Sequence, residues 1–228
     1  MIYFVNPSTE AVREAIKTRA DLGIIATPTS TRVSQWTVHS DWIADNGCFG
    51  KNFNEERWWR WLERRAEDRG NRCRFATAPD VVGNHEDTLA RSVPWLPRIR
   101  DLGYPAAFVA QDGAVPATVP WDDLDALFIG GTTDFKLSEA ARDLVVEAVK
   151  RGKHAHMGRV NSRRRLNTAH SWGCHSVDGT YLVFGPSVNL PKLIGWLDDL
   201  PVTATDPADK PGQMTLLGWL DEVPLEKE

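Results

Sequence analysis

Short runs of apolar residues recur along the chain, and between them apolar residues return every three or four positions. The runs that predict β-strands are residues 2–6, 22–27, 42–46, 73–78, 105–111, 126–131, 154–158 and 175–184. Several of these runs are almost continuously apolar, which is typical of parallel strands covered on both faces. The pattern therefore indicates parallel strands that alternate with helices.

Residues 138–151 show the clearest helical spacing of apolar positions. Ser138 is placed to cap the start of this helix, and Gly152 is placed to end it. The segment 85–102 is also helical in pattern, but the two prolines inside it must kink or split a helix.

Eight strands that alternate with helices predict a small (β/α)8 TIM barrel of the α/β class. A doubly wound open sheet is the alternative, because eight βα units can also form that fold. No Gly-x-Gly-x-x-Gly motif follows the first strand, which weakens the dinucleotide-binding version of the open sheet. We expect residues 1–200 to form the catalytic barrel and residues 201–228 to form a C-terminal extension with a short docked helix.

Composition narrows the class of protein. The chain has 228 residues, of which 42% are hydrophobic and 25% are charged, as in ordinary globular proteins. Its apolar runs are far shorter than the ~20 residues of a membrane span, and its first residues do not resemble a signal peptide. Three scattered cysteines fit a reducing compartment, so we expect a cytoplasmic protein with no membrane partner. The net charge of −4 excludes a generally basic surface for nucleic acid but leaves room for a local basic groove.

The C-terminal ends of barrel strands surround the active site in enzymes of this fold. Asp45 and Asp80 follow the third and fourth predicted strands, and Asp178 interrupts the eighth. Two such aspartates can serve as an acid/base and a nucleophile, and a carboxylate pair is the usual means of cleaving a glycosidic bond. Turn formation or solvation is the alternative role for each acid.

Five short elements in chain order resemble motifs of the tRNA-guanine transglycosylase family. They are IADNGCF at 43–49, FVAQDG at 108–113, FIGG at 128–131, HMG at 156–158 and SVD at 176–178. They are similar, in that order, to the family's Asp-Ser-Gly-Gly-Phe-Gln, Val-Gln-Gly-Gly, Gly-Gly and Leu-Met-Gly elements and to the segment with its aspartate nucleophile. Within the family the chain most resembles the short, phage-type deazapurine DNA transglycosylases.

The resemblance implies a role for each matching residue. Asp178 would be the nucleophile at C1′ of the target nucleoside, and Asp45 would be the general acid/base. The residues implied to bind the guanine-type base are Asp80, Gln111, Gly130, Gly131 and Met157. The implied reaction is a two-step, retaining exchange of guanine in DNA for a 7-deazaguanine such as the 7-cyano form (preQ0). It would need no cofactor and no metal.

The chain departs from the family pattern at several positions. Asn46, Cys48 and Gly50 replace the Ser, a Gly and the Gln of the first motif, so the loop after Asp45 should differ in shape. Asp112 replaces a Gly and adds an acid beside the base-binding motif. No cysteine follows Cys174, so the family's zinc-binding subdomain is expected to be absent. That absence argues against the usual tRNA-binding mode and favours another nucleic acid.

Two basic clusters are candidate contacts for nucleic acid. Arg159, Arg163, Arg164 and Arg165 follow the seventh strand. Arg57 and Arg60 lie on a predicted helix over 54–68, which is also rich in tryptophan and is therefore partly core. Such clusters bind phosphates and stack on bases in some proteins and are simply solvated in others.

The predicted function is that of a DNA-guanine transglycosylase, a pentosyltransferase whose partners are DNA and a 7-deazaguanine base. Two further partners are possible: a second copy of the chain in a homodimer, or an accessory protein that opens the duplex. If the chain is encoded by a phage, the expected location is the host cytoplasm. The alternatives are a catalytically silent nucleic-acid-binding subunit, a tRNA-acting relative, and a hydrolase of small nucleosides or sugars.

Overall fold

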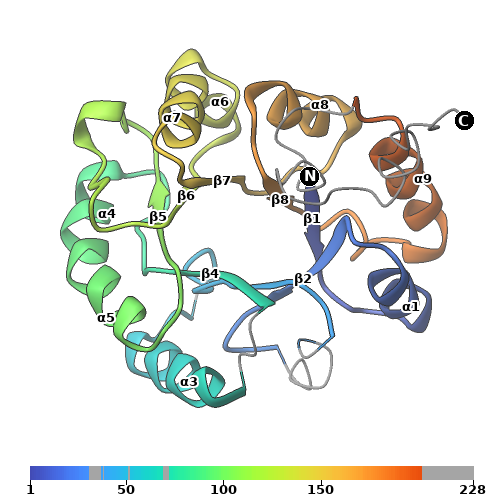
Figure 1. Cartoon of the computed structure of the whole chain (residues 1–228), viewed down its shortest axis with the longest axis horizontal. Helices are drawn as coiled ribbons and strands as arrows, with labels where there is room; N and C mark the ends of the chain where they lie inside the picture. The colour runs from blue at the N-terminus through green and yellow to red at the C-terminus, as the bar shows by residue number, and fades with distance from the viewer. Residues whose placement is uncertain (31–36, 38, 51, 69–71, 202–228) are drawn as a thin grey trace, which may run out of the picture.

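A computed structural model describes residues 1–30, 37, 39–50, 52–68 and 72–201. The described part forms a closed ring of eight parallel strands surrounded by helices (Figure 1). The predicted docked helix of the C-terminal extension falls on residues 202–228, which lie outside the described residues.

The barrel closes because each strand pairs in parallel with the next and β8 pairs with β1. The strands are β1 (Ile2–Val5), β2 (Leu22–Ala26), β3 (Trp42–Ala44), β4 (Cys73–Thr77), β5 (Ala106–Ala110), β6 (Ala126–Ile129), β7 (His154–Met157) and β8 (Ser176–Asp178). The predicted (β/α)8 barrel is therefore confirmed, and the doubly wound alternative is wrong.

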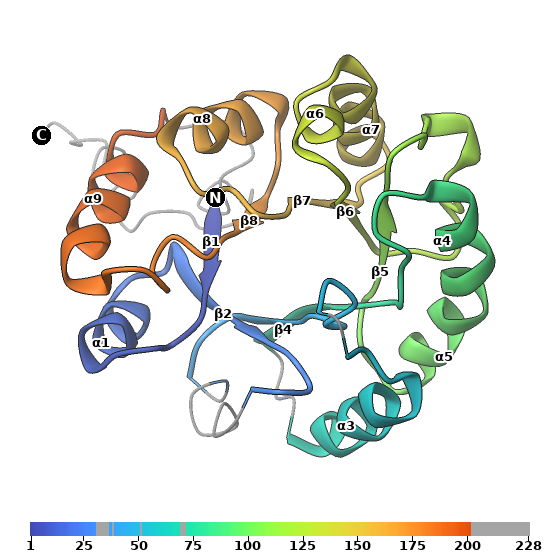
Figure 2. The same cartoon turned by 180° about the vertical axis from the view of Figure 1, so that it is seen from behind.

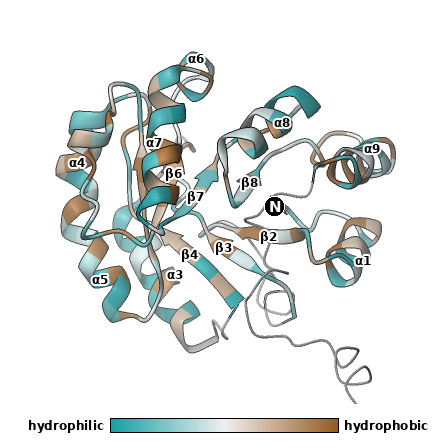
Figure 3. Cartoon of the chain, turned by 45° about the horizontal axis from the view of Figure 1, so that its top comes forward, coloured by the Kyte–Doolittle hydropathy of each residue, from teal (hydrophilic) through white to brown (hydrophobic). Residues whose placement is uncertain are grey.

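The helices cover the outside of the barrel, as the views from both ends show (Figures 1 and 2). They are α1 (Glu10–Thr18), α3 (Glu55–Asp68), α4 (His85–Ser92), α5 (Leu96–Asp101), α6 (Thr133–Lys136), α7 (Glu139–Lys150), α8 (Arg163–Trp172) and α9 (Pro186–Asp198), with short 3₁₀ turns η2 (Val93–Trp95) and η3 (Pro116–Thr118). These helices carry both apolar and polar residues (Figure 3). Within the described residues, no helix has the length and apolar character needed to cross a membrane.

Local sequence signals fix the ends of the helices. The Ser138 side chain accepts a hydrogen bond from the backbone N–H of Ala141 and so caps α7, as predicted. Asn54 caps α3 in the same way, through the N–H of Arg57 at 2.8 Å. The proline-containing segment 85–102 is divided into α4, η2 and α5, because proline cannot donate the hydrogen bond that a continuous helix requires.

Two apolar cores lie on either side of the barrel wall, because successive strand residues point to opposite faces. The larger core lies between strands and helices and includes Met157 and Val177. The smaller core fills the barrel interior with Phe4, Ile43, Phe75, Ala107, Val109, Ala126 and Phe128. A filled interior leaves chemistry to the rim of the barrel, where the strands end.

The eighth strand is shorter than the predicted range 175–184. β8 ends at Asp178, and a turn follows in which the N–H of Val183 bonds the carbonyl of Thr180. Val183 and Phe184, which the apolar pattern assigned to the strand, are 45% and 73% exposed. The correction has a consequence for the site: Asp178 does not interrupt a strand but terminates one, at the rim of the barrel.

Candidate active site

A cavity of about 530 Å³ opens at the carboxyl ends of the strands. Its lining includes Asp45, Asn46, Phe49, Asp80, Gln111, Phe128, Gly130, Gly131, Lys136, Gly158, Arg159 and Asp178. Six of the seven residues predicted to be catalytic or base-binding therefore share one cavity. They come from the ends of five different strands, which only closure of the barrel brings together.

Asp178 is 7% exposed, and both of its carboxylate oxygens are held. Oδ2 lies 2.9 Å from Nε2 of His156, and Oδ1 accepts the backbone N–H of Arg159 at 3.0 Å. Arg159 has a positive φ of 58°, an uncommon conformation outside glycine, which turns its N–H toward the carboxylate. This arrangement orients a carboxylate that borders the cavity.

Asp45 lies directly after β3, and its Oδ1 accepts the N–H of Gly47 at 2.8 Å in a tight turn. Burial, with the nearby charge of Asp178, raises the pKa of Asp45 to about 7. The turn that the sequence allowed for Asp45 is therefore present, but it also places the acid in the cavity. A carboxyl group that is partly protonated near neutral pH can both give and take a proton.

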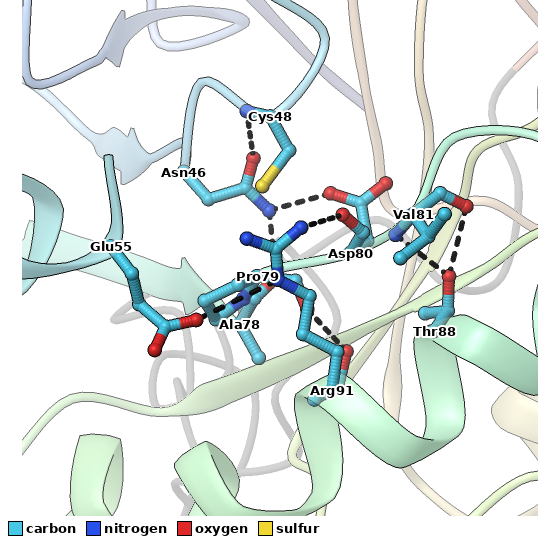
Figure 4. Close-up of polar contacts among 10 residues, drawn as sticks. Asn46, Cys48, Glu55, Ala78, Pro79, Asp80, Val81, Thr88 and Arg91 are labelled. Carbon is cyan, nitrogen blue, oxygen red and sulfur yellow. Dashed lines mark hydrogen bonds and ion pairs between the residues drawn. The ribbon is translucent and has the colours of Figure 1, made fainter. Parts of the chain in front are cut away.

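Asp80 is held by two amide side chains. Its Oδ1 accepts from Nδ2 of Asn46 at 2.8 Å, and its Oδ2 accepts from Nε2 of Gln111. The Asn46 amide also donates to the carbonyl of Ala78 at 2.7 Å, and its oxygen accepts the N–H of Cys48 (Figure 4). Burial raises the pKa of Asp80, whereas these amide hydrogen bonds oppose that rise. Asn46, which departs from the family motif, thus has a defined role in orienting Asp80.

The backbone of Asp80 is fixed from the helix behind it. Arg91 of α4 donates to the Asp80 carbonyl at 3.2 Å and lies 3.6 Å from the carboxylate of Glu55. Ser92 donates to the carbonyl of Pro79. Thr88 forms hydrogen bonds with both backbone groups of Val81 (Figure 4). The loop that carries Asp80 is therefore a rigid wall of the cavity.

Gly130 and Gly131 form another wall, at the end of β6. A Cβ added at Gly130 would lie 2.6 Å from Cγ1 of Val109 and 2.9 Å from Nε2 of Gln111. Gly131 has a φ of +76°, a left-handed conformation that favours glycine. The two glycines therefore allow the backbone to pass close to Gln111 and to border the cavity.

Met157 does not lie in the cavity, and its predicted contact with the base is wrong. It is 1% exposed and belongs to the core between the barrel and the helices. The reason is the alternation of strand residues: His156 points into the barrel, so its neighbour must point out. Phe128, whose ring borders the cavity, is the apolar residue available at this site.

Two residues of the site were not assigned to it from the sequence. The sequence analysis places His156 only within the HMG element, and its contact with Asp178 depends on the register between β7 and β8. Lys136 lies on the four-residue helix α6, is 5% exposed and borders the cavity. Burial and the nearby Arg159 lower the pKa of Lys136 to about 8. No periodic pattern in so short a helix could have indicated a buried lysine.

The predicted basic residues fall into two groups. Arg159 borders the main cavity with its guanidinium over the ring of Phe49, 4.2 Å from the centroid. Arg57 borders an adjoining cavity of about 900 Å³, which shares Asp45, Asn46 and Phe49 with the first.

The other arginines do not border either cavity. Arg165 donates to the carbonyl of Arg159 at 3.3 Å and so supports that loop. Arg60 and Arg163 form exposed ion pairs with Glu56 and Asp199, at 2.6 Å and 2.8 Å. Arg164 is exposed on α8. Among the described residues, no group of three or more His, Cys, Asp or Glu side chains is arranged to hold a metal ion.

Comparison with known proteins supports the barrel fold but does not indicate a family or an activity. No family model matches the sequence, and no curated protein matches it. Among solved structures, the chain is similar to tryptophan synthase from M. tuberculosis, in the ligand-free form of a variant with one substitution in TrpA. The match has a TM-score of 0.56 at 14% identity and covers 86% of this chain and 88% of the other. At that identity the likeness shows a common barrel fold alone.

Proposed function

We propose that this chain is a base-exchange transglycosylase that replaces guanine in DNA with a 7-deazaguanine base. In the first step the Asp178 carboxylate attacks C1′, and the C1′–N9 bond breaks as its electron pair leaves with the guanine, which takes a proton from Asp45. In the second step the incoming base gives a proton to Asp45 and attacks C1′, and Asp178 is released. The observation that carries the proposal is that Asp178 and Asp45 border one cavity in different environments.

The contrast between the two acids supports these roles. Asp178 accepts a backbone N–H on one oxygen and faces a histidine with the other, and these two contacts orient its carboxylate for attack as a nucleophile. Asp45 has a pKa raised to about 7, which suits a group that alternates between acid and base. Two carboxyl groups in different environments of one site are a common basis for such a division of roles.

The wall formed by Asp80 and Gln111 supports recognition of a guanine-type edge. A carboxylate oxygen has more than one lone pair, so Asp80 can accept N–H groups of a base while still bonded to Asn46 and Gln111. The Gln111 oxygen accepts the N–H of Gly83 at 2.9 Å, which directs its amide NH₂ toward Asp80 and the cavity. One hydrogen of that NH₂ is left to donate to a base carbonyl.

The adjoining cavity supports a polymeric substrate. It is the larger of the two, it meets the first at Asp45, Asn46 and Phe49, and Arg57 borders it. An extruded nucleotide bound at the acids would have its flanking phosphates and bases near such a groove. A hydrolase of small nucleosides would have no need of this adjoining cavity.

A covalent trap tests the proposal. The protein is incubated with guanine-containing duplex DNA, and in parallel with tRNA, without the incoming base, and is then denatured and run on a gel. We expect a protein–DNA adduct that disappears in Asp178→Asn and on addition of preQ0. Asp143→Asn, on the exposed face of α7, is the matched control and should form the adduct normally.

The other outcomes separate the alternatives. An adduct with tRNA alone would keep the chemistry and overturn the DNA substrate. Release of guanine from free guanosine without an adduct to either polymer would favour the small-molecule hydrolase. Salt-sensitive binding of DNA without any reaction would favour the silent binding subunit.

A further inference from the structure

A chain of polar side chains runs through the barrel interior from the half-buried His154 to the buried Asp178. Nε2 of His154 lies 2.7 Å from Oγ of Ser176, and that Oγ lies 2.8 Å from Nδ1 of His156. Nε2 of His156 then lies 2.9 Å from Oδ2 of Asp178. The chain exists because β7 and β8 each direct alternate residues inward and pair with His156 opposite Ser176.

The part of this chain around His156 is packed among apolar rings. His156 and Ser176 are both 0% exposed. The ring of His156 is 4.4 Å from that of Phe128 and 5.2 Å from that of Phe75, measured between centroids. Polar groups placed in such an interior are costly unless each finds a partner. A valine or leucine pair would fill the same space, so packing alone does not account for the chain.

The hydrogen bonds can be directed in one consistent way when Asp178 is ionised and the ring of His156 is neutral. The carboxylate can only accept, so Nε2 of His156 carries a proton and Nδ1 accepts. The hydroxyl of Ser176 must then donate to Nδ1, which leaves its oxygen to accept from His154. Burial, with the neighbouring His175 and His156, lowers the pKa of His154 well below the usual value, so that ring is neutral.

We propose that His156, held in place by Ser176 and His154, is the positioning residue that keeps the Asp178 carboxylate directed into the cavity. We call His154, Ser176 and His156 the relay. It fixes the tautomer of His156, and the tautomer decides whether the ring nitrogen that faces the carboxylate carries a proton. The backbone N–H of Arg159 donates to the other carboxylate oxygen of Asp178, so both oxygens are fixed. The catalytic consequence rests on the proposed function, whereas the tautomer of His156 does not.

The tautomer is tested by ¹⁵N NMR of the histidine side chains in the wild-type protein, with each ring assigned through its own Cβ. We expect His156 to carry its proton on Nε2 and to have no proton on Nδ1, the atom that faces Ser176. A proton on Nδ1 would overturn this arrangement of hydrogen bonds. This measurement needs no substrate and no variant.

The positioning role is tested with Ser176→Ala, which removes the donor to His156 but leaves the contact between His156 and Asp178. We expect the rate of adduct formation to fall about 10- to 100-fold, as for loss of one hydrogen bond that supports a charged group, with an unchanged half-saturating DNA concentration. The ¹⁵N signal of His156 should shift in the same variant.

A matched control separates this role from general damage to the fold. His85 is also a buried histidine with a hydroxyl partner, Thr118 at 2.7 Å, but it does not border the cavity. His85→Gln should therefore keep the wild-type rate. An unchanged rate in Ser176→Ala would overturn the positioning role. If the wild-type protein forms no adduct at all, the proposed function fails while the NMR result still decides the relay.

Discussion

The ammonium group of Lys136 donates a 2.8 Å hydrogen bond to the carbonyl oxygen of Gly131, inside the cavity that holds the three aspartates. Asp45 and Lys136 both have shifted pKa values in this cavity, so the stability of the protein should depend on pH in a way that the amino-acid composition does not reveal.

Asp45→Asn should abolish base exchange and stabilise the protein. The raised pKa means that the folded state binds a proton more tightly than the unfolded state, so ionisation of Asp45 costs stability as the pH rises from about 4 to about 7. Asparagine removes that cost and can still accept the Gly47 N–H. We expect a gain of about 2 to 4 kcal/mol in the free energy of unfolding at pH 8 and almost none at pH 3.5.

Urea unfolding at the two pH values measures this effect. Asp143→Asn, on the exposed face of α7, is the control and should change stability little at either pH. A gain of the same size at both values would mean that Asp45 is not the titrating group. The wild-type exchange rate should also decline above about pH 7, where Asp45 loses the proton that the leaving base requires.

Lys136→Met should also stabilise the protein at neutral pH. The lowered pKa means that the unfolded state holds this proton more tightly, so the cost of the buried charge is full below pH 8 and disappears as the pH rises toward 10.5. We expect a gain of about 1 to 3 kcal/mol at pH 7, allowing for the lost bond to Gly131. Thermal unfolding at pH 7 and pH 10 checks it, and a larger gain at the higher pH would contradict the assignment.

Gly130→Ala should damage the cavity wall. The new methyl group would press on Val109 and on the Gln111 amide that orients Asp80, so we expect a loss of about 1 to 3 kcal/mol and weakened base binding. Gly195 in α9 has open space around it, and Gly195→Ala should instead stabilise the protein by about 0.5 to 1 kcal/mol. Chemical denaturation of both variants provides the comparison. Equal effects would show that the crowding at Gly130 is relieved without cost.

Arg57→Ala should lower the salt dependence of DNA binding, because Arg57 borders the groove beside the acids. We expect the slope of log K against log salt concentration to decrease by about 1. Arg60→Ala is the matched variant one turn away, where the guanidinium is paired with Glu56, and it should leave the slope nearly unchanged. Binding isotherms between low and moderate salt measure both. A larger effect at Arg60 would move the DNA path away from the groove.

Much of the fold could be predicted because the sequence patterns that specify its strands and helix ends are local. The strand positions follow from short apolar runs, and the helix ends follow from residues such as Ser138 and Pro94, whose effects act within a few residues. The overlong eighth strand is the exception. Val183 and Phe184 are apolar, but they lie in an exposed turn, and an apolar run does not by itself distinguish a strand from a surface loop.

The sequence by itself determined which acids stand at strand ends, and tertiary structure decided what each of them can do. Barrel closure and strand register bring Asp45, Asp80 and Asp178 around one cavity and set His156 against Asp178. The proton affinity of Asp45 and the burial of Lys136 also depend on residues distant in the chain. These properties arise from desolvation and from charges brought together in space, and a linear pattern contains neither.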